Sequence, residues 1–341
     1  MQKGTLKWGI LGTGLIANSM AKALVESKPN ELIAVASRTQ KNADAFAKKY
    51  NIKKIYQGYE KLLADKDVDV VYISFPNSLH AEWVIKCAEA GKHILCEKPF
   101  TVNLAEAKKA LAAVAKAKVF CMEAFMYRCH PQTQKIIDLV QENKIGNVHL
   151  IEAHFNVSNE LLKDTIHVDA NLASGGIMDM GGYCVSAARL IAGINKKCDF
   201  MQPKKIAGLA YIDKKNVDEY ATGILQFDDE CFAMVSTSTQ FGMYYGLRIS
   251  GDKGTLTIPK PWLIDQESHI YLELFDGTRE KYTVKTDLSL YCHEAETVAR
   301  FISEGKVQAE SPAMSWEDTL GNMQTLDQWR EAVNLHYSNE K

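Results

Sequence analysis

The first 120 residues alternate between two hydrophobic patterns. Short runs of aliphatic and β-branched residues are separated by stretches in which apolar side chains recur every three or four positions. Strand-like runs that alternate with helical ones predict βαβ units and a parallel sheet covered on both faces. The predicted strands are Leu6–Leu11, Leu32–Ala36, Val68–Ser74, His93–Cys96 and Val119–Met122. The predicted helices are Leu15–Ser27, Ala43–Tyr50, Tyr59–Ala64, Leu79–Ala90 and Leu104–Ala117.

After residue 125 the pattern changes to strands joined by short turns, with helices before and after them. Such strands predict a largely antiparallel sheet. We therefore expect an α/β domain over residues 1–125 and an α+β domain over residues 126–341, whose C-terminal helix is free to pack back on the first domain. The predicted strands are 148–157, 205–211, 220–227, 231–239, 245–250, 255–258, 270–274 and 281–284, and the predicted helices are 132–141, 176–191, 292–303 and 316–337.

Composition and charge narrow the class of protein. The 341 residues are 46% hydrophobic and 24% charged, with a formal net charge of −2. This is ordinary for a globular protein and provides no positive field for nucleic acid or an anionic membrane. No apolar run approaches the roughly 20 residues that cross a bilayer, and the N-terminus is typical of a first strand rather than a signal peptide. The eight cysteines are scattered, without a CxxC pair, which favours reduced thiols and a cytoplasmic enzyme.

A glycine-rich turn follows the first predicted strand and opens the first predicted helix. Its residues are Gly12, Thr13, Gly14, Leu15, Ile16 and Ala17, which match GxGxxG/A. The first glycine allows the tight turn, the second lets the backbone approach a pyrophosphate, and the small third residue lets helix and strand pack closely. The helix N-terminus offers N–H groups to the phosphates. At the head of repeated βα units, this pattern predicts a dinucleotide site rather than a plain turn.

The end of the second predicted strand indicates which dinucleotide binds. An NAD site usually has Asp or Glu there, on the ribose 2′-hydroxyl. This chain has Ser37, Arg38 and Thr39 instead. Arg38 can pair with a 2′-phosphate while Ser37 and Thr39 donate hydrogen bonds, which favours NADP over NAD. The alternative is that Arg38 is a solvated loop charge.

Three further segments follow strands of the predicted sheet, where this architecture binds ligands. They contain Pro76-Asn77-Ser78-Leu79-His80, then Glu97-Lys98-Pro99, then Met122 to Pro131. With GxGxxA and the later Gly-Gly-Ile-Met-Asp-Met-Gly-Gly-Tyr segment, the chain resembles the glucose–fructose oxidoreductase/inositol dehydrogenase (Gfo/Idh/MocA) family along its whole length. It looks most like the branch of dimeric dihydrodiol dehydrogenases and NADP-dependent xylose dehydrogenases.

The resemblance implies a Rossmann domain, an open-faced antiparallel sheet and hydride transfer at their junction. It implies that Lys98 is the catalytic lysine, with Pro99 after a cis bond, and that Asp179 and Tyr183 match the family's aspartate and its catalytic histidine or tyrosine. It also assigns cofactor-binding roles to Pro76, Asn77 and His80, which would help to seat the nicotinamide ribose, and to Glu97. Glu97 is otherwise interpreted as structural, and Asn77 or Ser78 as a helix cap.

The residues themselves support this chemistry. Asp179 and Tyr183 are four apart, so on an α-helix they share one face, and Gly181 and Gly182 between them would let a flat ring approach. A phenol is a poor base at neutral pH unless a nearby ammonium favours its phenolate. Lys98 can supply that charge, and Asp179 can orient Lys98 and accept from a substrate hydroxyl. The alternative is a Tyr and an Asp on a surface helix.

Other polar residues leave alternatives open. Tyr127 and Arg128 line a substrate cleft, or Arg128 pairs with Glu123 or another carboxylate. His149 and His154 point to opposite faces of one strand, so we predict no metal site. Cys96 and Cys129 have no pattern that makes either a nucleophile.

Together these features predict an NADP-dependent oxidoreductase, with NAD possible, acting on a carbinol of a small polyhydroxylated substrate such as an aldose or a trans-dihydrodiol. The alternatives are a glycosidase that uses tightly bound NAD for transient oxidation and a cofactor-sensing regulator without catalysis. Apolar strand residues such as Ile224, Leu225, Phe232, Met234 and Val235 predict a sheet face that needs cover, hence a homodimer or a larger dimer-based assembly.

Overall fold

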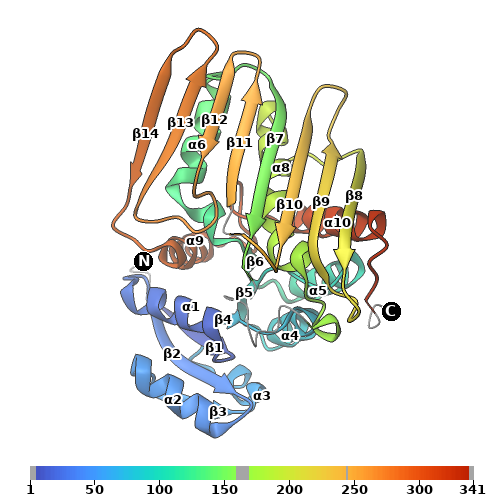
Figure 1. Cartoon of the computed structure of the whole chain (residues 1–341). Helices are drawn as coiled ribbons and strands as arrows, with labels where there is room; N and C mark the ends of the chain where they lie inside the picture. Colours follow the sequence, from blue (N-terminus) through green and yellow to red (C-terminus); the bar gives the residue numbers. More distant parts are fainter. Residues whose placement is uncertain (1–4, 159–168, 243–244, 338–341) are drawn as a thin grey trace. The chain divides into compact units, whose positions relative to one another are not determined.

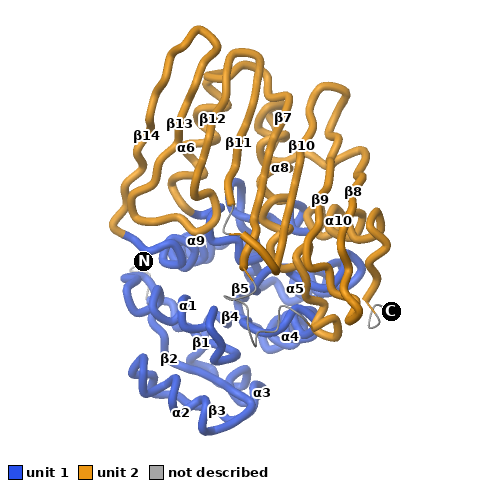
Figure 2. Tube along the Cα trace, in the orientation of Figure 1, with its two compact units in different colours: residues 1–129, 288–319 blue, residues 130–287, 320–341 orange. Residues whose placement is uncertain are grey.

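The computed structural model describes residues 5–158, 169–242 and 245–337. The chain divides into two compact units, coloured separately in Figure 2. Unit 1 comprises residues 1–129 and 288–319, and unit 2 comprises residues 130–287 and 320–341. The first boundary lies four residues after the one expected from the sequence, and the segment 288–319, expected in the second domain, belongs to unit 1.

A parallel sheet forms the centre of unit 1, with the strand order β3-β2-β1-β4-β5-β6. This is the order of a doubly wound dinucleotide-binding sheet, and it confirms the predicted α/β domain. The strands are β1 (Leu6–Leu11), β2 (Asn30–Ser37), β3 (Lys54–Gln57), β4 (Val70–Ile73), β5 (His93–Glu97) and β6 (Cys121–Ala124). The edge strand β3 was not predicted, because it is short and no residue in it is fully buried.

Helices from both ends of the chain cover this sheet. They are α1 (Leu15–Glu26), α2 (Gln40–Tyr50), α3 (Tyr59–Leu63), α4 (His80–Glu89), α5 (Leu104–Ala117) and α9 (Leu290–Ser303). Ala295, Val298 and Phe301 of α9 are buried in the same cluster as Trp8 of β1. The ring of Phe301 stacks on that of Phe120 with centroids 6.4 Å apart. This shared core explains why the segment that contains α9 belongs to unit 1.

Unit 2 is built on a second sheet with the order β14-β13-β12-β11-β7-β10-β9-β8. Its neighbouring strands pair antiparallel except β10 and β7, which run parallel. This confirms the largely antiparallel prediction. The strands are β7 (Val148–Asn156), β8 (Lys205–Ile212), β9 (Asp218–Gln226), β10 (Phe232–Ser238), β11 (Tyr245–Gly251), β12 (Gly254–Ile258), β13 (Glu267–Leu274) and β14 (Arg279–Lys285).

One face of the second sheet is covered by helices and the other is exposed. In Figure 1, α6 (Pro131–Gln141) and α8 (Gly182–Asn195) lie on the same side of it. Residues of α10 (Trp316–Ala332) pack near β8 and β9, where Trp329 lies against Gly208 and Gly223. The opposite face presents large apolar side chains to solvent. These are Leu209, Tyr211, Tyr220, Ile224 and Met234 on β8–β10.

The interior of unit 2 contains an apolar helical stretch, Ala170–Asn195. Among the described residues, it is the one helix that is long and apolar enough to cross a membrane, and its apolar window is fully buried inside the protein. This stretch has 26 residues, and it is longer than the helix 176–191 that the sequence predicted there. Burial within unit 2 identifies it as a core helix. None of the eight cysteines, all of which lie in described segments, forms a disulfide.

Candidate functional site

The glycine-rich turn lies between β1 and α1 at the carboxyl edge of the first sheet. Gly12 has a φ of +105°, and a Cβ there would lie 2.7 Å from Oγ of Ser74, so only glycine fits. Gly14 has nothing within 4 Å of its Cβ position, which leaves space above the start of α1. The first turn of α1 carries no acidic side chain. An open cradle at a helix N-terminus fits the phosphates of a dinucleotide.

Arg38, the first residue after β2, lies near an aromatic group. Ser37 is buried, whereas Arg38 and Thr39 are exposed, and Thr39 accepts a hydrogen bond from the Asn42 amide at the start of α2. Burial raises the pKa of Tyr59, and the nearby Arg38 guanidinium opposes that shift. The Tyr59 ring packs on Phe75 with centroids 4.6 Å apart. Arg38 therefore lies next to a partly apolar wall, without a carboxylate at the position where an NAD site has one.

The segment after β4 is tied to the segment after β5. Pro76 precedes a short 3-10 turn, Asn77–Leu79, and Asn77 is buried. The fully buried His80 ring hydrogen-bonds the carbonyl oxygens of Pro99 at 2.7 Å and Phe75 at 2.8 Å. His80 thus holds two backbone segments together, and its described contacts are structural.

Glu97 ends β5 and Lys98 follows it, and the Lys98–Pro99 bond is cis, which confirms that expectation. Glu97 is buried and accepts hydrogen bonds from the Tyr72 hydroxyl and, at 3.2 Å, from the Lys98 amide. Burial raises the pKa of Glu97, while the Lys98 ammonium and the Tyr72 hydroxyl act to lower it. Both oxygens of Glu97 accept a hydrogen bond within unit 1, whereas the Lys98 side chain is partly exposed.

A second buried carboxyl, Glu294 of α9, was not found from the sequence. Neither of its carboxyl oxygens has a hydrogen-bond partner among the described residues. Burial, reinforced by the negative charge of Glu97, raises the pKa of Glu294 well above its ordinary value. A sequence signal existed in the spacing of α9, where position 294 lies on the apolar face with Ala295 and Val298.

Arg128 and Tyr127 follow β6 and are buried. The Arg128 guanidinium donates to Asp318 at 2.6 Å and also to the carbonyl of Pro312. Arg128 was expected either to line a substrate cleft or to pair with a carboxylate. Its contacts correspond to the ion pair, and the partner is Asp318 rather than Glu123. Glu123 instead accepts from the Phe100 amide at 2.9 Å and the Thr319 hydroxyl at 2.9 Å.

Asp179 and Tyr183 belong to one helical segment of unit 2. Asp179 lies in a π-helix, Ile177–Gly181, that leads directly into α8, and both side chains are almost fully buried. The wider π-helical turn changes the angle between the two side chains from that of a regular α-helix. The Asp179 carboxylate accepts from the Gly175 amide at 3.3 Å.

The Tyr183 ring lies in an aromatic cluster of unit 2. Its centroid is 5.1 Å from that of Phe155 on β7 and 5.9 Å from that of Trp262. The indole N–H of Trp262 donates to the His154 carbonyl at 2.9 Å, which fixes that ring. Tyr183 is thus a phenol held by apolar rings, and not a residue on a solvated helix face.

The small residue between Asp179 and Tyr183 accommodates a ring of the protein itself. A Cβ on Gly181 would lie 2.8 Å from Cζ3 of Trp329. Gly208 and Gly223 approach the same indole, with Cβ positions 3.0 Å from its Nε1. Within the described part of unit 2, the flat ring against Gly181 is therefore Trp329. Nothing in the sequence alone indicated that Trp329 lies against Gly181, Gly208 and Gly223.

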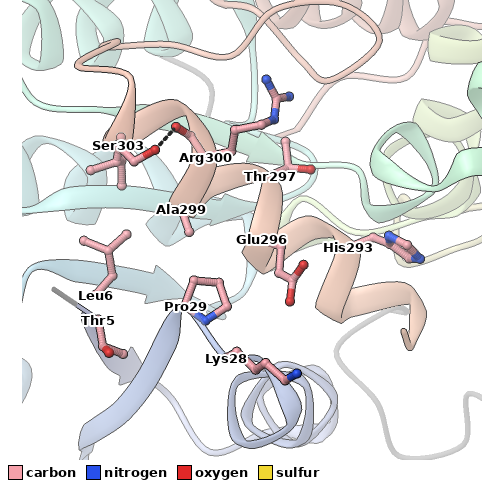
Figure 3. Close-up of a pocket in the computed structure, with 11 residues that line it drawn as sticks. Thr5, Leu6, Lys28, Pro29, His293, Glu296, Thr297, Ala299, Arg300 and Ser303 are labelled. Atoms are coloured by element: carbon pink, nitrogen blue, oxygen red, sulfur yellow. Dashed lines mark hydrogen bonds between the residues drawn. The ribbon is translucent and has the colours of Figure 1, made fainter. Parts of the chain in front are cut away.

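A cavity of about 880 Å³ lies within unit 1, at the amino ends of β1 and β2. Figure 3 shows Lys28 and Pro29 on one side of it and Glu296 and Arg300 of α9 on the other. Dinucleotides bind at the carboxyl ends of such strands, so this cavity is not the predicted cofactor site. Among described residues, no group of three or more His, Cys, Asp and Glu side chains has the arrangement of a metal site.

Comparisons with known proteins agree with this architecture. Residues 6–125 match the model of the GFO/IDH/MocA oxidoreductase family with its NAD-binding Rossmann fold, and residues 133–257 match the GFO/IDH/MocA C-terminal domain. The chain is 33% identical over 325 residues to a D-xylose 1-dehydrogenase (NADP(+)) of Haloferax volcanii, covering 94% of this chain and 95% of the relative. It is 30% identical to a trans-1,2-dihydrobenzene-1,2-diol dehydrogenase of Xenopus tropicalis, covering 97% and 99%.

A solved structure supports the fold independently. A 3-ketoreductase from Actinomadura kijaniata, in complex with NADP and TDP-benzene, superposes with a TM-score of 0.87 over 97% of this chain and 98% of the other, at 24% identity. At that identity the likeness shows the fold. The family models together with the full-length relatives show that this chain belongs to the GFO/IDH/MocA family of oxidoreductases, with an NAD(P)-binding Rossmann domain.

Proposed function

We propose that this chain catalyses NADP-dependent hydride transfer to and from a carbinol of an aldose or a trans-dihydrodiol. The observation that carries the proposal is Tyr183, a buried phenol four residues after the buried carboxylate Asp179. The D-xylose 1-dehydrogenase (NADP(+)) and the dihydrobenzenediol dehydrogenase that match nearly the whole chain support this substrate class.

The residues of unit 1 fit the cofactor. The turn from Gly12 to Ile16 would hold the phosphates, because Gly14 leaves the start of α1 open. Ser37, Arg38 and Thr39 would hold the 2′-phosphate, since no carboxylate stands there to repel it. His80, with Pro76 and Asn77, would shape the nicotinamide end by keeping the Phe75 and Pro99 backbone in place. When bound, the nicotinamide accepts or supplies the hydride.

The proton is handled by this chain's own side chains. During oxidation the Tyr183 oxygen takes the proton of the substrate hydroxyl, and during reduction it returns it. Lys98, as the proposed catalytic lysine, would supply the positive charge that favours a phenolate, and Asp179 would accept a hydrogen bond from the substrate hydroxyl. The hydrogen bonds of Glu97 hold the backbone of Lys98, so Glu97 supports the lysine rather than acting as a second base.

The test is NADP+ reduction by the whole chain, screened over aldoses, inositols, anhydrosugars and trans-dihydrodiols. We expect steady NADPH formation with at least one aldose or trans-dihydrodiol, and weaker activity with NAD+. Glycoside cleavage without net NADPH release would instead identify a glycosidase with bound NAD. Cofactor binding without turnover of any of these substrates would indicate a sensor.

We also propose that the chain forms a homodimer, or an assembly of dimers, through the exposed face of the second sheet. Ile224 and Met234 are 52% and 45% exposed on that face, whereas Leu225 and Val235 point inward and are buried. Ile224→Glu should release monomers, measured as mass in solution at micromolar concentration. The control Lys214→Glu changes a solvated position and should leave the mass unchanged. A monomeric wild type would contradict the proposal.

A further inference from the structure

Asp218 is a buried carboxyl that opens β9 in unit 2. It is 0% exposed although it begins an edge-proximal strand. A register shift between Tyr211 and Ile212 accounts for this, because Tyr211 pairs with Tyr220 whereas Ile212 pairs with Asp218. The extra residue, Glu219, breaks the strict alternation of β9, which turns Asp218 toward the interior.

The Asp218 carboxyl contacts the start of the segment that carries Asp179. Its Oδ2 accepts a hydrogen bond of 2.7 Å from the amide of Ile177, the first residue of the π-helix. A Cβ on Gly175 would lie 2.1 Å from Oδ1, and a Cβ on Gly176 would lie 3.1 Å from Oδ2. Gly175 and Gly176 therefore leave room for the Asp218 carboxyl to approach the backbone. The hydrogen bond between Asp218 and the Ile177 amide fixes where the π-helix begins.

A neighbouring strand fastens the same turn. The Thr237 hydroxyl on β10 donates to the Gly176 carbonyl at 2.9 Å. The Asp179 amide donates to the Gly175 carbonyl at 2.9 Å. Asp218 and Thr237 thus hold the amide and the carbonyl side of one turn, and Asp179 is the first ionisable side chain that follows it.

The charge state of Asp218 agrees with these contacts. Burial and, to a smaller extent, the Asp179 carboxylate raise the pKa of Asp218 to about 8, against the opposing effects of the Ile177 amide and the Arg330 guanidinium of α10. Oδ1 has no hydrogen-bond partner among the described residues. A proton on Oδ1 leaves Oδ2 free to accept from Ile177 and places no second negative charge beside Asp179.

We propose that Asp218 is a positioning residue for Asp179: its carboxyl anchors the first turn of the π-helix and thereby sets the orientation of the Asp179 carboxylate. The proposal rests on the proposed function only for its kinetic consequence. The anchoring itself concerns unit 2 alone.

The test compares two substitutions of Asp218. Asp218→Asn keeps an acceptor for the Ile177 amide without a charge, whereas Asp218→Ala removes the acceptor. Because small misplacements near a reacting group can cost up to about 10²-fold in rate, we expect Asp218→Ala to lower kcat roughly 10- to 100-fold while KM for NADP, which binds unit 1, is unchanged. Asp218→Asn should restore most of kcat at pH 7. The control Leu256→Ala opens a cavity in β12 and should lower stability without lowering kcat per folded molecule.

The pH profile provides a readout that a purely structural role would not move. The ratio of wild-type to Asp218→Asn kcat should be flat below pH 8 and fall above it, as wild-type Asp218 ionises beside Asp179. Asp218→Asn as damaging as Asp218→Ala at pH 7, or Asp218→Ala with normal kcat per folded molecule, would overturn the proposal.

Hydrogen exchange separates this proposal from the proposed function. The Ile177 amide should be protected in the wild type and in Asp218→Asn, and should exchange faster in Asp218→Ala. If the wild type reduces no NADP+ with any substrate, the proposed function fails, and exchange of the Ile177 amide still decides the anchoring. Equal exchange in all three proteins would refute it.

Discussion

Glu97 in unit 1 and Tyr183 in unit 2 are held in contrasting ways. Glu97 stands at a strand end, and its oxygens accept from the Tyr72 hydroxyl and the Lys98 amide. Tyr183 stands inside a helix that is buried on all sides, between the rings of Phe155 and Trp262. Directed hydrogen bonds therefore hold the Glu97 carboxyl, whereas aromatic rings surround the ring of Tyr183. A change of one polar atom at Glu97 should disturb the backbone of Lys98, and a change of ring volume at Tyr183 should disturb its packing.

The largest expected effect comes from substituting Tyr183 of unit 2 and Lys98 of unit 1, the two residues proposed to control proton transfer. Tyr183→Phe keeps the ring and its packing, so folding should survive while kcat falls by about 10²–10⁴. Lys98→Ala should be at least as damaging, and the double variant little worse than Lys98→Ala alone if the two act in one step. The measurement is turnover with saturating NADP and substrate. Tyr282→Phe and Lys92→Ala, a lysine at the opposite end of β5, are the controls. A Tyr183→Phe enzyme with near-normal turnover and an unshifted pH profile would make Lys98 the better candidate for the base.

The next effect is on the free energy of unfolding and tests the buried ion pair of unit 1. Arg128 and Asp318 are 0% and 2% exposed in their ion pair, so removing one partner leaves a buried charge. Arg128→Ala should lower the free energy of unfolding by about 3–5 kcal/mol. The matched control is Arg300→Ala, whose ion pair with Glu304 is exposed and should matter by less than about 1 kcal/mol. Equal losses for the two variants in urea unfolding would contradict this account.

Cofactor selectivity offers a smaller and sharper test. Arg38→Asp places a carboxylate where NAD sites have one, so NADP affinity should fall roughly 10- to 100-fold, the worth of a charge-assisted contact of about 1.5–3 kcal/mol. NAD affinity should change much less. Lys41→Asp makes the same charge change on the exposed start of α2 and should leave the NADP/NAD ratio alone. Unchanged NADP binding by Arg38→Asp, measured by titration calorimetry, would remove Arg38 from the cofactor site.

The smallest effect concerns pH and the edge strand β3. Burial acts to raise the pKa of Asp65, but the Lys54 ammonium, the Asp67 amide and the Tyr56 hydroxyl lower it to about 2. A lowered folded-state pKa contributes stability that is present above the ordinary Asp value of about 3.9 and is lost as pH falls toward 2. Asp65→Asn should therefore cost on the order of 1 kcal/mol or less at pH 7, and this loss should shrink as the pH falls toward 2. A loss that persists unchanged at pH 2 would show a packing effect, and Asp44→Asn is the exposed control.

Much of unit 1 could be predicted from the sequence because its functional positions follow strands. Parallel strands separated by helices bring their carboxyl ends to one edge, so Gly12, Arg38, Asn77 and Lys98 were placed together from order alone. The position of a residue after a strand does not predict which groups its side chain contacts. His80 was expected at the nicotinamide ribose, which stays a prediction, and no sequence signal indicated that its ring also contacts two backbone carbonyls.

In unit 2 the strands could be predicted from the sequence, but the contacts of its helices could not. The alternation of β8–β14 was readable because one face is buried. The π-helix was not, because it depends on Asp218, which a bulge turns inward against the alternation of Ala221, Gly223 and Leu225. Trp329 against Gly181 joins positions far apart in the chain, and no local pattern encodes such a pair.

The discontinuity of unit 1 has a consequence for how the protein is made. The first sheet leaves the ribosome early, yet the helix that buries Trp8 and Phe120, together with the carboxylate that neutralises Arg128, arrives only with residues 290–318. Until then the cluster around Trp8 and Phe120 has α1 and α2 but lacks the side chains of α9, and Arg128 lacks its carboxylate partner. Synthesis of unit 2 occupies that whole interval. The first half of the chain to be translated is thus among the last to be completed, and a chain arrested before residue 290 should depend on chaperones that shield exposed sheets.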